Sequence, residues 1–591
     1  MSLIVQKFGG TSVADSEKIL AAARKAIRAL QDGRQVVMVV SAMGKNTDML
    51  VNLAREISDR PPAREMDMLL ATGEQVSVAL MAMAIHSLGH KAISLTGAQI
   101  GIKTDSTHTR ARIRTISTDR IRTALDEGNI VIAAGFQGID EDYNITTLGR
   151  GGSDTTAVAL AAVLAADACE IYTDVDGVYT TDPRLLPEAR RMARVSYDEM
   201  LELASLGAGV MHSRSIEFAK KFSVPIHVRS SFTDRQGTII AVEPESPAQA
   251  VSGAAITKNE ARVTIQGVPD RPGTSLVIFS EIAKHNVTID MIVQNVGAEG
   301  KADLSFTVPR DDLSAAVVAV EHVVRQLGAA GYSHDDNVSK ISVVGLGMAR
   351  QTGVAERMFR QLAQADVNIL MITTSEIKIS VLVARDQAAL ALRTVHEAFQ
   401  LEREPDRSPG GETPRSDRHK ADAAAVIARL QGMEDLTISD IALDGTQARV
   451  SISGVPDSPG VAASVFEEVA AAGIFVDMIV QSFALSQRAN LSFTVPQNEL
   501  PKALDVAHKL TGQFHCGPVT HAPRVAKLSV SGIGLRSHTG VAVRMFGSLA
   551  EAGINVEMIN TSEVRVNVVV SGDSGAPGLA ALQKAFEDVQ R

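Results

Sequence analysis

The sequence is poor in the residues that build disulfide frameworks, cysteine-based metal sites and stacking platforms for bases. Its two cysteines, Cys169 and Cys516, lie far apart in a chain of 591 residues, which fits a reducing cytoplasm. Tryptophan is absent and aromatic residues make up 4% of the chain, so a surface that stacks single-stranded nucleic acid is not favoured. The net charge of −10 lacks the basic excess that nucleic acid or an anionic membrane surface would require.

Long apolar runs are also scarce. The longest bland stretch, AVALAAVLAADA at residues 157–168, is too short to span a bilayer and contains Asp167, so we expect no transmembrane helix. The apolar run in the first residues, MSLIVQKFGGTS, is too short for a signal peptide. We therefore expect a cytoplasmic protein that binds neither membrane nor nucleic acid, and its length predicts two or more domains.

Residues 1–245 are predicted to form one α/β domain, because stretches with strand character alternate with stretches of helical periodicity. The expected strands lie at residues 3–8, 36–42, 130–136 and 169–175, and the expected helices at 16–30 and 155–166. Such alternation is typical of a layered α/β sandwich with a mainly parallel central sheet.

The C-terminal half contains a duplicated block. GVPDRPG at 267–273 recurs as GVPDSPG at 454–460, and DMIVQN at 290–295 recurs as DMIVQS at 477–482. The pattern GVA-x-RMF, which begins at position 353, recurs at position 540 with the same offset between its copies. One constant offset across several motifs indicates duplication of the whole block.

Each block itself holds two similar units, so the half should contain four modules. Every unit runs strand, glycine-containing loop, helix and two strands, which is half of a ferredoxin-like pattern. The modules are expected at residues 260–335, 338–400, 445–520 and 525–591. Residues 401–422 are rich in proline, glycine and charge and are expected to be a flexible linker.

The first candidate for chemistry is the loop Lys7-Phe8-Gly9-Gly10-Thr11-Ser12, which ends a strand and leads into a helix. The glycines allow backbone N–H groups to approach an anion, and Lys7 would bring a point charge to transferring phosphates. The alternative interpretation is a plain strand–turn–helix connection with an exposed lysine.

The second candidate is the loop Gly149-Arg150-Gly151-Gly152-Ser153-Asp154, directly before a predicted helix. Arg150 has the geometry to hold a carboxylate with two parallel hydrogen bonds. Ser153 or Asp154 is expected to cap that helix, because both residue types are good N-caps. Capping alone does not account for three glycines and an arginine in one loop.

The third candidate is Thr173-Asp174-Val175-Asp176-Gly177-Val178-Tyr179-Thr180-Thr181-Asp182-Pro183-Arg184, which follows a predicted strand. Ligands of open α/β sheets bind at the carboxyl ends of the strands. Asp174 or Asp176 would bond a ribose or a metal-bound water, Arg184 would reach phosphate, and Tyr179 would pack on the nucleotide. The alternative interpretation is a solvated turn.

All three loops come after predicted strands, so we expect one edge of one sheet to present them together. Ser41 and a turn at Thr72-Gly73-Glu74 should join the same edge. The sequence contains no Walker A loop, no H-E-x-x-H and no C-x-x-C pair. GLGMAR at 345–350 and GIGLRS at 532–537 lack the third glycine of a dinucleotide fingerprint, and we interpret both as effector loops.

Taken together, these motifs resemble the aspartate kinase family, in the order of that family and over the N-terminal part of the chain up to residue 245. The modules beyond residue 260 resemble ACT domains, which bind amino acids in the same enzymes, here as two tandem pairs. The resemblance implies an amino-acid kinase fold that uses ATP with Mg²⁺ to phosphorylate the side-chain carboxylate of aspartate. Mg²⁺ would arrive on ATP, so the protein itself is assigned no metal ligand.

The resemblance also implies roles for individual residues. Lys7 and Asp154 would be catalytic, with Asp154 steering the transfer. Aspartate would be held by Ser41, Thr47, Glu74, Arg150 and Ser153, with Arg150 on its α-carboxylate and Glu74 facing its ammonium. ATP would contact Lys7, Phe8, Gly9, Gly10, Thr173, Asp174, Tyr179, Asp182 and Arg184. Gly209 stands where many members carry a lysine, for which Lys220 or Lys221 would substitute.

The ACT resemblance implies effector sites where the loop after the first strand of one module meets its neighbour. The residues concerned are Asp270, Gln294, Asn368, Thr374, Ser375 and Glu376, with their copies Asp457, Gln481, Asn555, Thr561, Ser562 and Glu563. An amino acid needs donors for its carboxylate and acceptors for its ammonium, and this set supplies both. Lysine, threonine or both are the expected inhibitors, and a homo-oligomer joined through the ACT modules is expected.

Two other functions compete with this interpretation. One is a kinase for glutamate or acetylglutamate, which the TGE and GRGGSD motifs disfavour. The other is an inactive sensor whose N-terminal domain only binds nucleotide, which the complete set of Lys7, Arg150, Asp154 and Asp174 disfavours. An aspartate side chain is already an anion at neutral pH, so no general base is required, and catalysis reduces to positioning and charge neutralisation.

Overall fold

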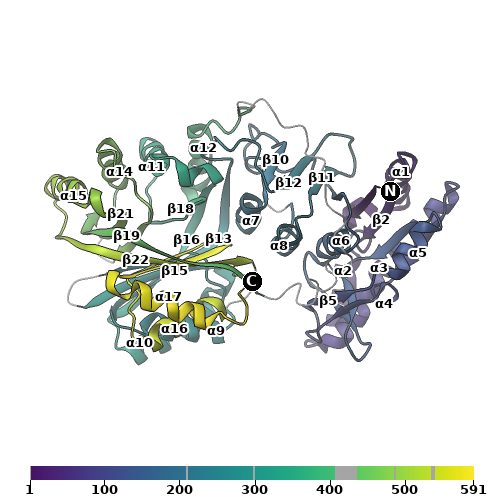
Figure 1. The fold of residues 1–591 in the computed structure, drawn as a ribbon, viewed down its shortest axis with the longest axis horizontal. Helices are drawn as coiled ribbons and strands as arrows, with labels where there is room; N and C mark the ends of the chain where they lie inside the picture. Colours follow the sequence, from purple (N-terminus) through teal and green to yellow (C-terminus); the bar gives the residue numbers. More distant parts are fainter. Residues whose placement is uncertain are drawn as a thin grey trace. The chain divides into compact units, whose positions relative to one another are not determined.

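The computed structural model describes residues 2–207, 210–296, 300–405, 436–484, 488–533, 535 and 540–590. Most of the expected linker and the expected lysine-substitution position at Gly209 lie outside these residues. The described chain forms two compact units, whose elements are labelled in Figure 1. Unit 1 contains the described residues within 2–179, 191–246 and 405, and unit 2 contains those within 180–190, within 247–404 and from 436 onward.

Unit 1 is built on an eight-stranded sheet with the strand order β10-β12-β11-β9-β1-β2-β6-β3. All of its pairings are parallel except that of β11 with β12, which confirms the predicted mainly parallel sheet. Its strands are β1 (Leu3–Phe8), β2 (Gln35–Val40), β3 (Ala92–Leu95), β6 (Ile130–Ala134), β9 (Ala168–Thr173), β10 (Arg194–Ser196), β11 (Ile226–Ser230) and β12 (Thr238–Ala241).

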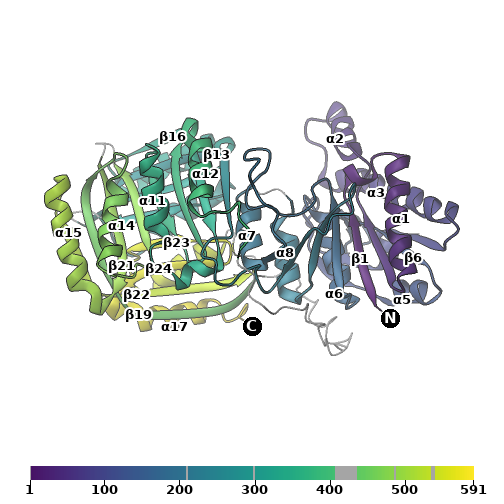
Figure 2. The same cartoon turned by 90° about the horizontal axis from the view of Figure 1, so that it is seen from above.

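Helices cover both faces of this sheet (Figure 2). Alternate residues of β1 and β2, among them Phe8 and Met38, pack with α1 (Ser16–Gln31) and α3 (Ala63–Ser87) in one apolar core. Residues of β1 one position away, such as Lys7, therefore point to the opposite face, where α6 (Gly152–Val163) lies. The remaining helices are α2 (Asn46–Ile57), α4 (Gly97–Ile100), α5 (Asp119–Asp126), α7 (Tyr197–Ser205) and α8 (Ser213–Phe222).

A second, four-stranded sheet in unit 1 has the order β5-β4-β7-β8. It consists of β4 (Ile102–Thr104), β5 (Ile113–Ile116), β7 (Gln137–Ile139) and β8 (Ile145–Thr147). The GRGGSD loop follows β8, so the prediction that all three loops leave one sheet is wrong. The loop still reaches the main sheet, because α6, which begins within it, packs against β1 and Asp154 pairs with Lys7.

Helix α3 is the one described helix long and apolar enough to cross a membrane, with a mean hydropathy of 1.6 over its best window. Gly73, Glu74 and Gln75 interrupt its apolar residues, so the sequence pattern did not predict this helix. More than half of that window is buried, and Val78, Met81 and Ile85 belong to the core of unit 1. Its contacts are those of a core helix.

Unit 2 contains one continuous twelve-stranded sheet, with the order β14-β15-β13-β16-β18-β17-β20-β21-β19-β22-β24-β23. The first block supplies β13 (Gly253–Pro269), β14 (Ile292–Val296), β15 (Lys301–Val308), β16 (Gly331–Val344), β17 (Met371–Thr374) and β18 (Lys378–Ala384). The second supplies β19 (Thr437–Pro456), β20 (Ile479–Ala484), β21 (Arg488–Pro496), β22 (Val519–Ile533), β23 (Met558–Thr561) and β24 (Arg565–Ser571).

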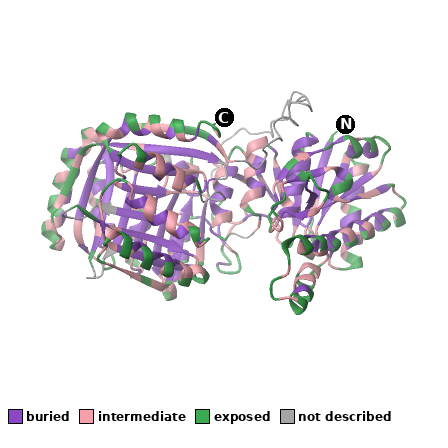
Figure 3. Ribbon diagram, turned by 90° about the horizontal axis from the view of Figure 1, so that it is seen from below, coloured by how far each residue is buried: buried purple, intermediate pink, exposed green. Residues whose placement is uncertain are grey.

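The helices of unit 2 form two outer layers with the strands between them (Figure 1). One layer joins the first and fourth modules through α9 (Thr274–Lys284), α10 (Leu313–Leu327), α16 (Gly540–Glu551) and α17 (Gly575–Ala585). The other joins the second and third through α11 (Val354–Gln364), α12 (Ala388–Ala398), α14 (Val461–Ala471) and α15 (Leu500–Phe514). Figure 3 shows the strands buried and the outward sides of these helices exposed.

The inner face of the sheet carries a third core, which reflects the duplication directly. It consists of Met291, Val293, Val338, Met371 and Leu382, together with the equivalent residues of the second block, Met478, Val480, Val525, Met558 and Val569. Methionine fills irregular gaps well, and it occupies two of the five positions in each block. Both blocks therefore bury equivalent positions against one another.

Candidate functional site

The ion pair between Lys7 and Asp154 is the centre of the candidate active site. Lys7 comes from the end of strand β1, just before the glycine loop, and Asp154 from the first turn of α6. Their Nζ and Oδ1 atoms are 2.6 Å apart, and both side chains are about one-tenth exposed. A helix N-terminus adds positive potential beside this pair, so an anion placed here meets an ammonium and the backbone N–H groups of a helix terminus.

The glycines of the first loop are required by close packing. A Cβ on Gly10 would lie 2.8 Å from the carbonyl oxygen of Ala42, so the loop after β2 approaches the backbone too closely for any side chain. The N–H of Gly9 donates to the carbonyl of Tyr172, at 3.3 Å. The ring of Tyr172 stacks on Phe8, with centroids 4.7 Å apart, so the phenyl group that was predicted to contact ATP is buried in the core.

Glu74 lies buried in the middle of α3, so the prediction of a turn at residues 72–74 is wrong. The helix passes the loop after β2 so closely that a Cβ on Gly73 would lie 2.8 Å from that of Ala42, which explains the glycine. Glu74 Oε1 accepts a hydrogen bond from the N–H of Ala42 at 3.1 Å, and Oε2 has no partner among the described residues. Burial raises the pKa of Glu74 to about 7.

Ser41 and Thr47 come from the segment that approaches both Gly10 and Glu74. The N–H of Ser41 donates to the carbonyl of Phe8 at 3.1 Å, and both Ser41 and Thr47 are half-buried. The structure therefore brings the loop after β1, the loop after β2 and the middle of α3 together.

The GRGGSD loop places Arg150 at the surface and Ser153 in the interior. The residue at the N-cap of α6 is Gly151, so the expectation that Ser153 or Asp154 caps this helix is wrong. Gly151 has a φ of 71°, and a Cβ there would overlap that of His212. His212, which sequence reasoning missed, thus fixes the loop, and burial together with Arg214 lowers its pKa.

The third candidate segment, residues 173–184, begins at Thr173, where β9, the neighbour of β1, ends. Thr173 Oγ1 donates to Asp174 Oδ1 at 3.2 Å, and Asp174 is exposed. The Tyr179 hydroxyl donates to Asp176 Oδ1 at 2.6 Å, and Arg235 pairs with Oδ2 at 2.7 Å. Although burial opposes ionisation, these two bonds hold the pKa of Asp176 below its ordinary value.

The end of the same segment belongs to unit 2. Asp182 and Arg184 pair with each other at 2.8 Å, and this contact lowers the pKa of Asp182. The segment is held there through Thr180. The Thr180 hydroxyl lies 3.0 Å from Nε2 of the buried His396 in α12, and the Thr180 carbonyl accepts a hydrogen bond from the N–H of Ala254 at 2.7 Å.

Lys220 is one of the two lysines expected to substitute for a lysine at position 209. Its Nζ pairs with Oδ1 of Asp198 at 2.5 Å.

The predicted effector residues gather at two equivalent junctions. At the first–fourth junction, Asn555 Nδ2 donates to Asp270 Oδ1 at 2.7 Å and Gln294 Nε2 donates to the carbonyl of Val556 at 2.7 Å. At the second–third junction, Asn368 Nδ2 donates to Asp457 Oδ1 at 2.9 Å and Gln481 Nε2 donates to the carbonyl of Ile369 at 3.2 Å. Each junction therefore pairs one module of the first block with one module of the second block.

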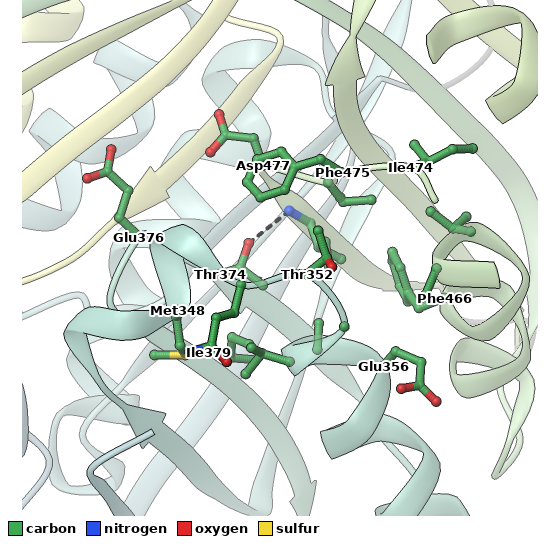
Figure 4. Close-up of a pocket in the computed structure, with 18 of the residues that line it drawn as sticks. Met348, Thr352, Glu356, Thr374, Glu376, Ile379, Phe466, Ile474, Phe475 and Asp477 are labelled. Atoms are coloured by element: carbon green, nitrogen blue, oxygen red, sulfur yellow. Dashed lines mark hydrogen bonds between the residues drawn. The ribbon is translucent and has the colours of Figure 1, made fainter. Parts of the chain in front are cut away.

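Each junction also contains a cavity, and the two cavities have equivalent linings. The cavity at the second–third junction measures about 320 Å³, and Figure 4 shows Thr374, Glu376, Phe466 and Asp477 around it. The cavity at the first–fourth junction measures about 100 Å³ and is lined by the corresponding Thr561, Glu563, Phe279 and Asp290, together with Ser562. Ser375 and Met348 of the GLGMAR loop also line the larger cavity, whereas half of GIGLRS lies outside the described residues.

Sequence comparison agrees with both units. The model of the amino acid kinase family matches residues 2–230, and the ACT domain model matches residues 341–399, 450–510 and 528–586. Aspartate kinase Ask_LysC of Stutzerimonas stutzeri is 49% identical over 415 residues, which cover 70% of this chain and all of that protein. The chain belongs to the aspartate kinase family. It is a kinase that carries ACT regulatory domains.

Solved structures of this family share the fold. The aspartate kinase of Synechocystis is 41% identical, with a TM-score of 0.53 over 99% of this chain and 98% of its own. Aspartokinase III of E. coli, solved in complex with lysine and aspartate, is 24% identical, with a TM-score of 0.53 over 67% of this chain and 99% of its own. The amino-acid kinase fold followed by ferredoxin-like ACT modules, predicted from the sequence, is confirmed.

Proposed function

We propose that this aspartate kinase transfers the γ-phosphoryl group of ATP to the side-chain carboxylate of L-aspartate, giving 4-phospho-L-aspartate. The proposal rests chiefly on the Lys7–Asp154 ion pair, because an ammonium held at a helix N-terminus supplies what the meeting of two anions requires. The reaction commits aspartate to the synthesis of lysine, threonine and methionine.

The residues divide into two sets around that pair. Lys7 neutralises the phosphoryl group in transfer, and Asp154 fixes the Lys7 ammonium. The unpaired Oε2 of Glu74 receives the ammonium of aspartate, Arg150 holds the α-carboxylate, and Ser41, Thr47 and Ser153 complete the pocket. Gly9, Gly10, Thr173, Asp174, Tyr179, Asp182 and Arg184 are assigned to ATP, and Phe8 supports them from the core. Mg²⁺ supplies further charge neutralisation on the phosphates.

Trapping with hydroxylamine tests the product. An acyl phosphate reacts with hydroxylamine to give a hydroxamate, so aspartate and MgATP should yield aspartate hydroxamate together with one ADP. Glutamate and acetylglutamate, offered at the same concentration, should yield less than about a hundredth as much, because a site that pairs both charges of its substrate rejects a misplaced one. Equal yields from all three acids would refute the proposed substrate.

We infer further that lysine, threonine or both inhibit the enzyme from the two junctions. The inference is supported by the polar side chains from both partner modules at each junction, which offer donors for a carboxylate and acceptors for an ammonium. An effector that prefers one conformation by roughly 1–3 kcal/mol is sufficient for feedback inhibition. The enzyme is also proposed to be a homo-oligomer associated through its ACT modules.

Calorimetric titration with lysine and with threonine tests the two junctions separately. Replacing Gln294 by alanine should weaken binding of the amino acid at the first–fourth junction by roughly 10- to 100-fold. The variant lacks the side chain that is assigned to the effector, and it leaves the carbonyl of Val556 without the donor that it has here, at a cost of about 1–3 kcal/mol for a buried group. Gln481→Ala should do the same at the second–third junction. The half-buried Gln387, which donates to the carbonyl of Asp366 at 3.0 Å and is assigned no effector role, serves as the control when it is replaced in the same way. Absence of heat from both amino acids with the wild type would remove the inference.

A further inference from the structure

A fully buried carboxylate, Asp67, lies on α3 two turns before Glu74 and has no part in the chemistry above. It accepts hydrogen bonds from His108 Nδ1 at 2.7 Å, from the N–H of Thr109 at 3.0 Å and from the hydroxyl of Thr147 at 2.5 Å. We call Asp67, His108, Thr109 and Thr147 the Asp67 cluster. A buried carboxylate with this many donors keeps its partners in one fixed geometry.

The cluster joins two segments that are far apart in sequence. Thr109 lies in the turn between β4 and β5 with a φ of 67°, a left-handed conformation that is unusual for a β-branched residue. Thr147 is the last residue of β8, shortly before Arg150. A strained residue persists where its surroundings fix it, and here its N–H is fixed by Asp67.

The turn at Thr109 lies directly against the GRGGSD loop. The carbonyl oxygen of Thr109 would lie 3.0 Å from a Cβ on Gly149, whose own φ of 77° places it in the left-handed region. The N–H of Ala111 donates to the carbonyl of Thr147 at 2.9 Å. Arg214 binds both segments, donating to the carbonyls of Leu148 at 2.5 Å and Ala111 at 2.8 Å.

Two helix faces therefore determine where the GRGGSD loop lies. Asp67 of α3 holds its approach strand and the adjoining turn, while His212 and Arg214 at the start of α8 hold its other side. Glu74, two turns along α3 from Asp67, is fixed by the same rigid helix. The spacing between Glu74 and Arg150 is thus set through Asp67.

We propose that the Asp67 cluster is a positioning device that sets the affinity for aspartate by fixing Arg150 relative to Glu74. Asp67 and His108 are positioning residues, and neither touches the reacting atoms. The proposal rests on the assignment of Arg150 and Glu74 to aspartate. Nucleotide binding is assigned to the loops after β1 and β9, whereas the described hydrogen bonds of the cluster join α3 to β8 and to the turn after β4. Loss of the cluster should therefore change the KM for aspartate much more than the KM for ATP.

Two valine substitutions in β8 provide a matched test. Thr147→Val removes the hydroxyl that binds Asp67, whereas Thr146→Val removes a neighbouring buried hydroxyl that bonds Thr104 Oγ1 at 2.6 Å. Both lose one buried hydrogen bond, but only Thr147→Val alters the cluster. Steady-state kinetics should show the KM for aspartate raised at least 10-fold in Thr147→Val, with the KM for ATP changed less than twofold. Thr146→Val should leave both KM values unchanged.

Conservative replacements complete the experiment. Thr147→Ser keeps the hydroxyl and should restore the KM for aspartate to within about threefold of the wild type. His108 is partly exposed, so His108→Ala provides a second variant in case Thr147→Val does not fold, and it should raise the same KM by a similar factor. Equal changes in both KM values, or an unchanged KM for aspartate in the folded variants, would overturn the proposal. Arg150→Ala tests the underlying assignment separately, because an unchanged KM there would refute the role of Arg150 itself.

Discussion

Replacing Lys7 by alanine should lower kcat about 10³-fold and leave the fold intact. Removing one preorganised donor to a developing charge typically lowers kcat by about 10²–10³-fold, and Lys7 carries a full positive charge. Its loss also leaves Asp154 without the ammonium that lies 2.6 Å away, so a negative charge remains beside two anionic substrates. A continuous assay of ADP release with saturating aspartate and MgATP measures the effect.

The partner residue separates chemistry from stability in this experiment. The double variant Lys7→Ala/Asp154→Asn removes both charges, so it should unfold at a temperature close to that of the wild type while remaining as slow as the single variant. Lys18→Ala is the matched control, because Lys18 pairs with Asp15 on the surface of the same unit and should retain full activity. A Lys7→Ala enzyme within tenfold of the wild-type kcat would contradict the proposed role of Lys7.

Glu74→Gln should raise the KM for aspartate about 100-fold and abolish one limb of the pH profile. In the free enzyme Glu74 has a pKa of about 7 because it is buried, and only its ionised form can receive an ammonium. The kcat/KM for aspartate should therefore rise with pH up to about 7 and then level off. The glutamine variant should show no such rise between pH 6 and 8, and a rise of unchanged midpoint would contradict the assignment.

The stability of the empty enzyme should change in the opposite direction over the same range. Since the folded-state pKa of Glu74 is raised, the protonated side chain is the form that the fold accommodates. The contribution of the Glu74 side chain to the free energy of unfolding is complete below pH 4.5. This contribution is lost as the pH rises to about 7, by an amount on the order of 3 kcal/mol. The difference in thermal midpoint between wild type and Glu74→Gln should report this loss.

Local patterns in the sequence were sufficient for four strands of the main sheet of unit 1, namely β1, β2, β6 and β9, and for its first helix, but not for its other strands. They were misleading at Glu74, because a glycine beside a threonine is typical of a turn when only neighbours in sequence are considered. The reason for Gly73 lies in Ala42, which belongs to a different segment of the chain and whose Cβ excludes any side chain from that point of the helix. Gly151 is a second case, because the residue that excludes a side chain there is His212, which is also distant in the sequence.

The duplication was fully visible in the sequence, but its spatial consequence was not. A repeat shows that the two blocks have the same fold, whereas it does not show which modules bury their apolar faces together. The four methionines of the inner core, at 291, 371, 478 and 558, are equivalent positions that meet only after both blocks have folded. Asp67 was missed for a related reason, because its partners at 108, 109 and 147 form no local motif.

The excursion of residues 180–190 into unit 2 has a consequence for how such an enzyme can be divided. A cut after residue 245 removes most of unit 2, including His396 and Ala254, which are hydrogen-bonded to the buried Thr180. Thr180 itself lies before that cut and would remain. The domain boundary predicted near residue 245 therefore differs from the division of the described chain into two compact units. A fragment that ends at residue 245, whether released by a protease or encoded by a shortened gene, would still contain residues 180–190. It would lack His396 and Ala254, to which Thr180 is hydrogen-bonded in the full chain.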